Sequence, residues 1–360
     1  MNYNTNELRS CEQSRRLIPD VRLVTHEESF ENIRVVQCFS HGTSNHITNS
    51  SARRNRNCCD HEAMMNRFYP ASEFPFTHGF KAITPHMAGW TYSGLAILKI
   101  EANSKCVVDV GLLKDSEGAL IPLNVTNVHI KIDEQEFTLK GREGVFKGAS
   151  DWIYCAPGSQ IEITASTSGE IAIATAVAEK NFPSRYVEVL DEIEIRGAGH
   201  ATREVRPFMH PDKFSDADRL MAVELVTPDG NVSSYPPHRH DGIGDCPVAN
   251  EEIYYFRIGK VGLSHGDPEG FGFHRTYTAP EDANPFDDSI AIHDGDIYLV
   301  PRGYHGPCVA LPGYPMYYLN VLAGESSVRT MDFCDDPDHA WIRKSWQIEN
   351  SDSRVPWKVE

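Results

Sequence analysis

Four residues in the C-terminal half of the chain have the types and the order of a metal-binding site. His238 and His240 lie two residues apart, and on a β-strand such residues point to the same face. Glu252 begins the segment EIYYF, and His305 ends the turn sequence PRGYH after the segment DIYLV. Three imidazoles and one carboxylate bind zinc, manganese or iron and leave coordination positions open for water or substrate. Taken alone, each histidine would indicate only a surface residue, but the order of all four predicts a metal centre.

The elements that must position these residues are short strands. Alternating apolar residues, interrupted by Gly, Pro, Asn and Asp, predict strands at 92–100, 105–110, 128–132, 152–156, 160–165 and 171–177. A second strand-rich unit begins near Leu220, and no part of 80–345 shows a long helical stripe. Two successive units of similar size indicate an all-β protein with duplicated antiparallel barrels or sandwiches.

The same patterns suggest where the domains begin and end. We expect an N-terminal extension over 1–80 that is partly disordered, a first β domain over 81–195, a second over 196–345 and a tail over 346–360. The stretch 42–57 is polar and aperiodic, which predicts a dispensable, protease-sensitive segment. Within the extension, only the apolar run 33–39 is expected to form a strand.

Composition excludes several classes of partner. The formal net charge of -17 makes nucleic acid an unexpected partner, because an acidic surface repels phosphate backbones. The N-terminal segment 1–18 is polar, and no apolar run approaches the ~20 residues that a membrane helix needs. The nine cysteines are scattered and form no C-x-x-C pair. We therefore expect reduced thiols in a cytoplasmic protein.

Five longer segments have the length and specificity of family motifs: SSYPPHRHD (233–241), EEIYYFRI (251–258), GFGFHRTYT (270–278), DGDIYLVPRGYHGP (294–307) and GYPMYYLNVLAG (313–324). They resemble one family of enzymes, the 5-deoxy-glucuronate isomerases of bacterial inositol catabolism, within the cupin superfamily. AGWTYSGLAIL (88–98) and the connecting RGAGHATREV (196–205) also fit. The resemblance covers roughly residues 80–345 and leaves the N-terminal extension outside.

The resemblance implies a bicupin in which only the second barrel keeps its metal. In the first unit no histidine follows the turn at Pro157–Gly158, and His129 is alone on its strand. The family reaction is an aldose–ketose isomerisation of 5-deoxy-glucuronate to 2-deoxy-5-keto-gluconate. One divalent metal, zinc or manganese in preference to iron, would be held by His238, His240, Glu252 and His305.

Such a reaction needs a Lewis acid, a base and a cation for the substrate carboxylate. Arg275 carries a planar fork suited to a carboxylate and shares a strand face with Phe271, Phe273 and Tyr277, of which the phenylalanines are expected to be core. Tyr254 shares the face of Glu252. We therefore expect catalytic roles for Glu252, Arg275 and Tyr254, and substrate contacts from Arg275, Tyr277, Tyr304, Tyr318 and Asn320.

Several alternatives stay open at this point. The general base is Glu252, a tyrosine or a hydroxide on the metal. A cupin dioxygenase would use iron and O₂ at nearly the same ligand set, and a non-enzymatic sugar-binding cupin would keep a metal without turnover. The long flanking motifs favour an isomerase that acts on a small anionic sugar acid, and they leave a homo-oligomer open.

Overall fold

The computed structural model describes residues 66–357, with gaps at 110, 190–191, 264–265, 280–281 and 327. It also describes the backbone of residues 33–35. Its regular structure is almost entirely β-strand. The helical elements of this part of the chain are short: α1 (Pro85–Ala88), the 3-10 segment η1 (Val145–Lys147) and α2 (Ile342–Ser345). None of the described helices is long and apolar enough to cross a bilayer. The predicted all-β class is confirmed.

The first unit consists of two sheets. Their strand orders are β1-β5-β10-β7-β8 and β12-β9-β6-β11-β4-β3, and all the described pairs are antiparallel except β1 with β5. The strands are β1 (Ile33–Val35), β3 (Phe80–Ile83), β4 (Ser93–Ile100), β5 (Lys105–Val107), β6 (Ser116–Pro122), β7 (Thr126–Ile132), β8 (Gln135–Gly141), β9 (Trp152–Cys155), β10 (Ile161–Ala165), β11 (Gly169–Val177) and β12 (Arg185–Val187).

The second unit also consists of two sheets. The first has the order β13-β14-β15-β23-β18-β21-β2, and the second has the order β20-β19-β22-β17-β24 with β16 paired to β22. The strands are β2 (Phe68–Tyr69), β13 (Glu194–Arg196), β14 (Arg203–Arg206), β15 (Met221–Thr227), β16 (Val232–Ser233), β17 (His238–Arg239), β18 (Asn250–Ile258), β19 (Phe271–Tyr277), β20 (Asp287–His293), β21 (Ile297–Val300), β22 (Tyr304–Ala310), β23 (Met316–Gly324) and β24 (Cys334–Asp335).

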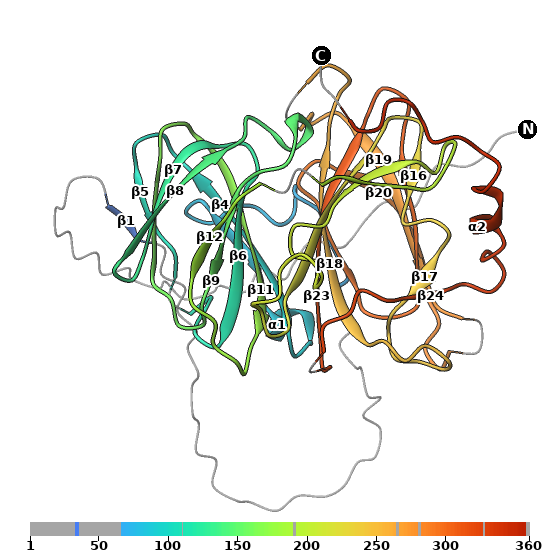
Figure 1. The fold of residues 1–360 in the computed structure, drawn as a ribbon, viewed down its shortest axis with the longest axis horizontal. Coiled ribbons are helices and arrows are strands. Elements are labelled where there is room, and N and C mark those ends of the chain that lie inside the picture. Colours follow the sequence, from blue (N-terminus) through green and yellow to red (C-terminus); the bar gives the residue numbers. More distant parts are fainter. Residues whose placement is uncertain are drawn as a thin grey trace, which may run out of the picture. The chain divides into compact units, whose positions relative to one another are not determined.

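Three apolar cores explain why some strands alternate and others are apolar throughout. On β7, Val128, Ile130 and Ile132 face the core inside the first unit, as their period of two predicts. On β18, Tyr254 faces the core inside the second unit, whereas Tyr255 faces a third core between the units. Strands such as β4, β11, β18 and β23 are buried on both faces because they lie where the units meet (Figure 1).

Residues 66–80 differ from the expected extension, because they are packed onto the two β units: the segment starting at 66 contacts the second unit, and Phe80 begins β3 of the first. The strand β2 pairs with β21, and Arg67 Nε lies 2.7 Å from Asp288 Oδ2. The expected tail is also anchored, since the Trp357 amide donates to Glu204 Oε2 at 2.6 Å. The segment 42–57, for which protease sensitivity was predicted, lies outside the described residues. The other domain boundaries stay predictions.

A buried carboxylate on β15 links the two units. Glu224 is 1% exposed and accepts hydrogen bonds from both terminal nitrogens of Arg142, which follows β8 of the first unit. It also accepts from Tyr317 Oη at 2.7 Å. Burial alone would raise the pKa of Glu224, but Arg142 and Arg206 outweigh burial, and the pKa lies below its usual range.

We predict that Glu224→Gln destabilises the protein by about 3–5 kcal/mol at pH 7, because it leaves Arg142 buried without a carboxylate. Since the folded-state pKa is depressed, this stabilisation is present above the unfolded pKa of about 4.3 and is lost as pH falls through the folded pKa. Urea unfolding from pH 7 to pH 3 should show the difference between wild type and variant shrinking in acid. Glu162→Gln breaks an exposed pair with Lys105 and should cost at most about 1 kcal/mol; equal losses in both variants would contradict the prediction.

Candidate metal centre

Three elements bring the four predicted ligands together inside the second unit. His238 on β17 lies opposite His305 on β22 in antiparallel register. Glu252 on β18 lies across the barrel, with its Oε2 2.8 Å from His240 Nε2 and 3.1 Å from His305 Nε2. His240, Glu252 and His305 are buried and present ligand atoms within 4.8 Å of one another. The ring of His238 lies beside them, 4.4 Å from that of His305 between centroids.

The hydrogen bonds of these side chains fit a cation. His238 Nδ1 and His240 Nδ1 lie 3.1 Å and 3.2 Å from the carbonyl oxygens of Pro236 and Asn250, an arrangement that directs each Nε2 inward as an acceptor or ligand. His305 is fully buried, and neither of its ring nitrogens has a hydrogen-bond partner among the described residues. Its Nε2 approaches the Glu252 carboxylate without hydrogen-bond geometry, as two ligands of one ion do.

The electrostatic environment favours neutral imidazoles at two of the three histidines. Burial, with His240 nearby, lowers the pKa of His238 to about 4. Burial and the neighbouring histidines also hold the pKa of His305 well below its usual value. For His240, burial disfavours the charged form, but the Glu252 carboxylate outweighs burial and raises the pKa. Metal ions bind the neutral form of imidazole, which is the form favoured at His238 and His305.

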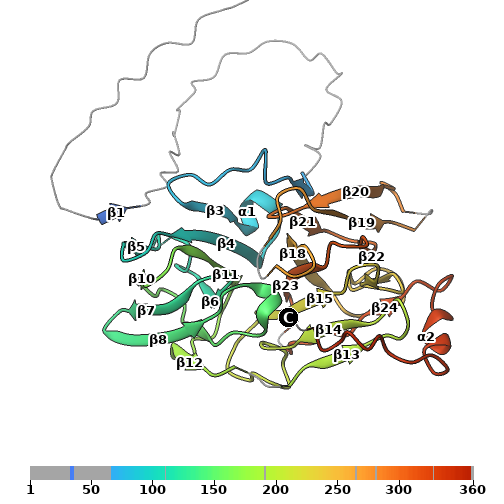
Figure 2. The same cartoon turned by 90° about the horizontal axis from the view of Figure 1, so that it is seen from above.

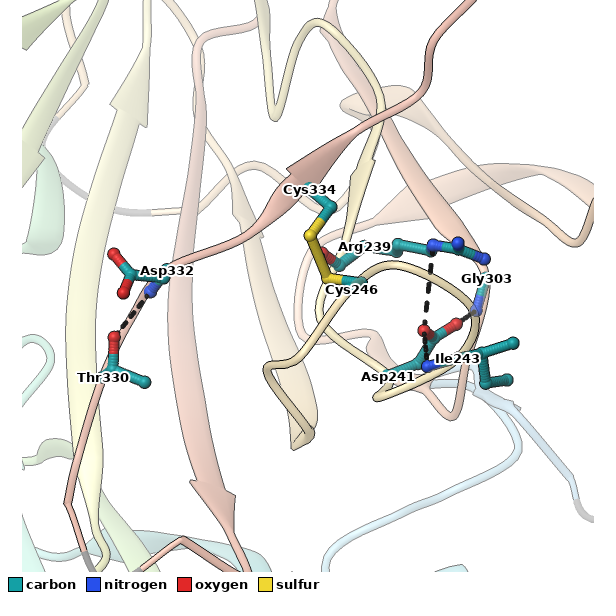
Figure 3. Close-up of a disulfide and its surroundings, with 8 residues drawn as sticks. All are labelled: Arg239, Asp241, Ile243, Cys246, Gly303, Thr330, Asp332 and Cys334. Carbon is teal, nitrogen blue, oxygen red and sulfur yellow. Dashed lines mark hydrogen bonds and ion pairs between the residues drawn. A yellow bond between two sulfur atoms is a disulfide. The ribbon is translucent and has the colours of Figure 1, made fainter.

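Asp241, directly after His240, ties the two histidine-bearing segments together. Its Oδ2 accepts the Gly303 amide at 2.7 Å, in the turn that precedes His305 (Figure 3). Gly303 has φ +83°, and a Cβ there would lie 2.4 Å from the Tyr277 carbonyl oxygen. Only glycine fits this turn, which explains the PRGYH sequence and aims His305 into the barrel.

A disulfide bond closes the segments around the centre, contrary to the expectation of reduced thiols. Cys246, in the loop between His240 and β18, is bonded to Cys334 on β24 (Figure 3). The adjoining Phe333 ring packs 4.7 Å from the His238 ring. Cys106, Cys155 and Cys308 are free, and the remaining four cysteines lie outside the described residues.

A cavity of about 400 Å³ opens beside the ligands, which is the size of a pocket for a small molecule. His238, His240, Glu252, Tyr254 and Asn320 line it together with residues of β13, β14 and α2. Figure 2 shows β13, β14, β24 and α2 on one side of the second unit. The full lining is Glu194, Arg196, Gly197, Arg203, Val223, Leu225, Ser234, His238, His240, Glu252, Tyr254, Asn320, Leu322, Met331, Phe333, Arg343 and Trp346.

Glu252 and Tyr254, which were predicted to share one face of β18, lie on its inner face. Tyr254 is two residues beyond Glu252 on the same face of β18, and its hydroxyl is 2.9 Å from Ser234 Oγ. Tyr318 on β23 joins the same network through Ser234 Oγ at 3.1 Å, but it is fully buried and does not line the cavity. Burial raises the pKa of both phenols above their usual value.

Arg275 and Tyr277 were expected to point into the barrel, but the face of β19 that carries them is the outer one. Their expected positions are therefore corrected. The inner face of this strand carries Gly272, His274 and Thr276. Arg275 is partly exposed, and its Nη2 lies 2.7 Å from Asp287 Oδ2. Alternation gives residues of one face but not which face is buried, and the apolar rings of Phe271 and Phe273 pointed to the wrong side.

Tyr304 also lies away from the cavity, in contact with Tyr277 at 5.7 Å between ring centroids. Two other arginines near the motifs have carboxylate partners. Arg257 pairs with Asp294 and Glu170, and Arg302 pairs with Asp282. None of these residues offers a free cation to a substrate in the cavity.

The first unit has no comparable centre in the part of the chain that the structure describes. His129 contacts Thr138 Oγ1 at 3.1 Å on an exposed sheet face. The single group of three or more potential ligands found among the described residues is the one in the second unit.

Sequence reasoning missed the basic residues of the cavity wall. Arg196 and Arg203 belong to the segment 196–205, which was interpreted as a connection, and Arg343 belongs to α2. A signal was present, since a mere connection has no need for the long motif RGAGHATREV. The aromatic lining residues Phe333 and Trp346 carried no pattern that would have identified them.

The disulfide gives a direct test. After blocking of free thiols and proteolysis without reductant, mass spectrometry should find a Cys246–Cys334 linked peptide that dithiothreitol removes. Because the bond closes a loop over 88 residues of sequence, Cys246→Ser should lower the unfolding free energy by about 2–4 kcal/mol. Both cysteines recovered in the blocked form would show that the protein carries a dithiol instead.

The chain is similar in sequence and in fold to proteins that are already known. The family model of the KduI/IolB family matches residues 71–342. The chain is 34% identical over 287 residues to the 5-deoxy-glucuronate isomerase of Geobacillus thermodenitrificans strain NG80-2, covering 78% of this chain and 97% of that protein. It is 32% identical over 268 residues to the 5-deoxy-glucuronate isomerase of Bacillus subtilis strain 168, covering 72% of this chain and 91% of the relative.

Two solved structures are similar in fold to this chain. An IolB-like protein from Salmonella typhimurium LT2 has a TM-score of 0.67 and 28% identity, covering 77% of this chain and 99% of that one. Bacillus subtilis oxalate decarboxylase, a protein with Mn(II) centres, has a TM-score of 0.51 at 11% identity and covers 77% of this chain and 81% of its own, which shows the shared fold alone. The sequence matches and the shared architecture lead to one conclusion: the chain belongs to the KduI/IolB family.

Proposed function

We propose that this protein is an aldose–ketose isomerase that converts 5-deoxy-glucuronate to 2-deoxy-5-keto-gluconate in inositol catabolism. The observation that carries the proposal is His305, which is buried with two unpartnered ring nitrogens at the point that Glu252 approaches. The relatives named 5-deoxy-glucuronate isomerase support the choice of reaction. We expect the cytoplasm as the site of action, as the metabolic substrate suggests.

The proposed ligands of the metal are His238, His240, Glu252 and His305. Nitrogen and carboxylate donors suit zinc and manganese, and the Mn(II) centres of oxalate decarboxylase occur on the same fold. When bound, a divalent cation supplies Lewis-acid polarisation of a carbonyl and the adjacent hydroxyl. The fully buried His305 gives this centre a rigid side away from the cavity, whereas Glu252 belongs to the cavity lining.

The chain's own residues then have to move one proton between neighbouring carbons. Glu252 and Tyr254 are the groups on the inner face of β18 that can exchange a proton with a substrate in the cavity. Glu252 Oε2 faces His240 and His305, whereas Oε1 makes no hydrogen bond to a described residue. We therefore assign Glu252 as the group that accepts the proton from the carbon next to the carbonyl.

Tyr254 has a complementary role. Its hydroxyl is held by Ser234, which Tyr318 also contacts, so the phenol is fixed in one orientation. From this position it donates a hydrogen bond to a substrate oxygen as negative charge develops there. Asn320, two residues beyond Tyr318 on β23, brings an amide to the same cavity.

The metal assignment has a sharp test. Purified protein should contain roughly one divalent metal per chain by elemental analysis. His238→Ala/His240→Ala should lose it, because half of the ligands are gone. His274→Gln is the control, since His274 is buried and inward-facing but contacts Cys308 and Thr276; it should keep the metal. Full metal content in the double variant would overturn the assignment.

The reaction is tested with the metal-loaded protein and 5-deoxy-glucuronate. Carbon-13 NMR should show the aldehyde replaced by a ketone, with no uptake of O₂ at an oxygen electrode. Glu252→Gln should reduce kcat by at least about a hundredfold, through loss of the base and of a ligand. Consumption of O₂ would indicate a dioxygenase, and tight binding without turnover would indicate a sugar-binding protein; either result rejects the isomerase.

A further inference from the structure

Arg203 is a buried cation inside the barrel that holds the proposed metal ligands. It begins β14, and two residues further along the same strand Val205 packs in the core of the second unit. Residues two apart on a strand share a face, so Arg203 points into this barrel. The intervening Glu204 points the other way and accepts from Arg206 Nε at 2.6 Å. Arg203 lines the same cavity as His238, His240 and Glu252.

Arg203 has no carboxylate partner among the described residues. Its Nη1 donates to the Ala201 carbonyl oxygen at 3.1 Å, and its Nε is buried without any hydrogen-bond partner in this part of the chain. The residue is 5% exposed. Burial lowers the pKa of Arg203 to about 10, which leaves it charged at neutral pH. An unpaired buried guanidinium is costly and calls for an anion that binds during function.

The other charges on the cavity wall are already neutralised. Arg196 is paired with Glu194, with Nε 2.6 Å from Oε1. Arg343 is paired with Asp335, with Nη2 2.6 Å from Oδ1. The Trp346 ring lies 5.4 Å from the guanidinium carbons of both Arg203 and Arg343. Among the arginines that line this cavity, Arg203 is thus the one without a carboxylate partner among the described residues, and its charge is available to a ligand.

A second buried polar group faces the same space. Asn320 is 8% exposed and lines the cavity, yet its Oδ1 has no hydrogen-bond partner among the described residues. An amide oxygen in this position accepts a hydrogen bond from a hydroxyl group. Arg203 and Asn320 together therefore offer one site for an anion and one for a sugar hydroxyl.

We infer that Arg203 binds the carboxylate of a six-carbon sugar acid whose carbonyl end lies at His238, His240, Glu252 and His305, while Asn320 accepts a hydroxyl hydrogen of the same molecule. The inference rests on the proposed function. A cavity of about 400 Å³ holds a molecule of this size with its two ends apart. Arg203 then determines specificity for acids over neutral sugars, the role that the sequence had suggested for Arg275.

The test compares D-glucuronate with its methyl ester, which lacks the negative charge and adds one methyl group, by isothermal titration of the metal-loaded protein. Wild type should bind the acid about ten to a hundred times more tightly, as a charge-assisted pair provides. Arg203→Gln should abolish this preference, mainly through weaker binding of the acid. Arg203→Lys should restore it in part, because Lys keeps the charge but lacks the fork.

Stability separates this role from a structural one. Since Arg203 is buried and unpaired, Arg203→Gln should melt at the wild-type temperature or above it. Arg275→Gln, the matched control, removes an arginine paired at the surface and should keep the wild-type preference for the acid. A wild-type protein without preference for the acid, or an Arg203→Gln protein that keeps the preference, overturns the inference. If Arg203→Gln fails to fold, Arg203→Met takes its place, and a wild-type affinity ratio in that variant overturns the inference.

These results are distinguishable from those that test the reaction. A protein that isomerises 5-deoxy-glucuronate with the same kcat/KM in wild type and Arg203→Gln keeps its proposed function and loses this inference. A protein that fails to isomerise the substrate but prefers the acid through Arg203 keeps the anion site and loses the proposed function.

Discussion

Burying an imidazole without hydrogen-bond partners costs free energy, and the second barrel is organised around one such residue. His305 has neither ring nitrogen satisfied by the described residues, a cost of the kind that a bound cation removes. The surroundings hold it in place: Asp241 fixes the turn before it, β17 pairs with it in register, and Glu252 approaches from across the barrel. Ordinary packing would have placed an apolar side chain there, so the position is explained by chemistry and not by stability.

The neighbouring glutamates on β18 show how one strand serves both the site and the fold. Glu252 points into the second barrel, where it meets His240 and His305. Glu251 points the opposite way, and its carboxylate accepts the backbone amides of Thr91, Tyr92 and Ser93 in the first unit. The first barrel therefore acts on the site indirectly, since it anchors the strand that carries Glu252. A unit without a metal cluster of its own among the described residues still contributes rigidity to the centre.

The alternation of residues along a strand predicted well which side chains share a face. It predicted less well which of the two faces points into the barrel. On β18, Glu252 and Tyr254 share the inner face as expected, because the histidine motif supplied an independent indication of which side is inside. On β19 no such indication existed, and the register shift between His274 and Thr276 against β22 adds an irregularity that alternation cannot foresee. Arg203 was invisible for a different reason: the chain around it is short of apolar residues and resembles a connection, although it forms a strand of the cavity wall. Contacts between distant segments, such as β2 with β21 or Cys246 with Cys334, leave no local pattern.

The placement of charge on the cavity wall reflects a balance between stability and binding. Most arginines close to the site are satisfied within the protein, as Arg257, Arg302 and Arg343 show through their carboxylate partners. Such pairs orient the wall but have no attraction left for a ligand. Arg203 is in the opposite condition, since it is buried without a carboxylate partner among the described residues, and the proposed substrate carboxylate would relieve this cost. Binding therefore draws on free energy that folding has left unsatisfied. The same reasoning applies to His305 and the proposed cation, so the proposed metal and the proposed substrate carboxylate would each relieve a cost of folding.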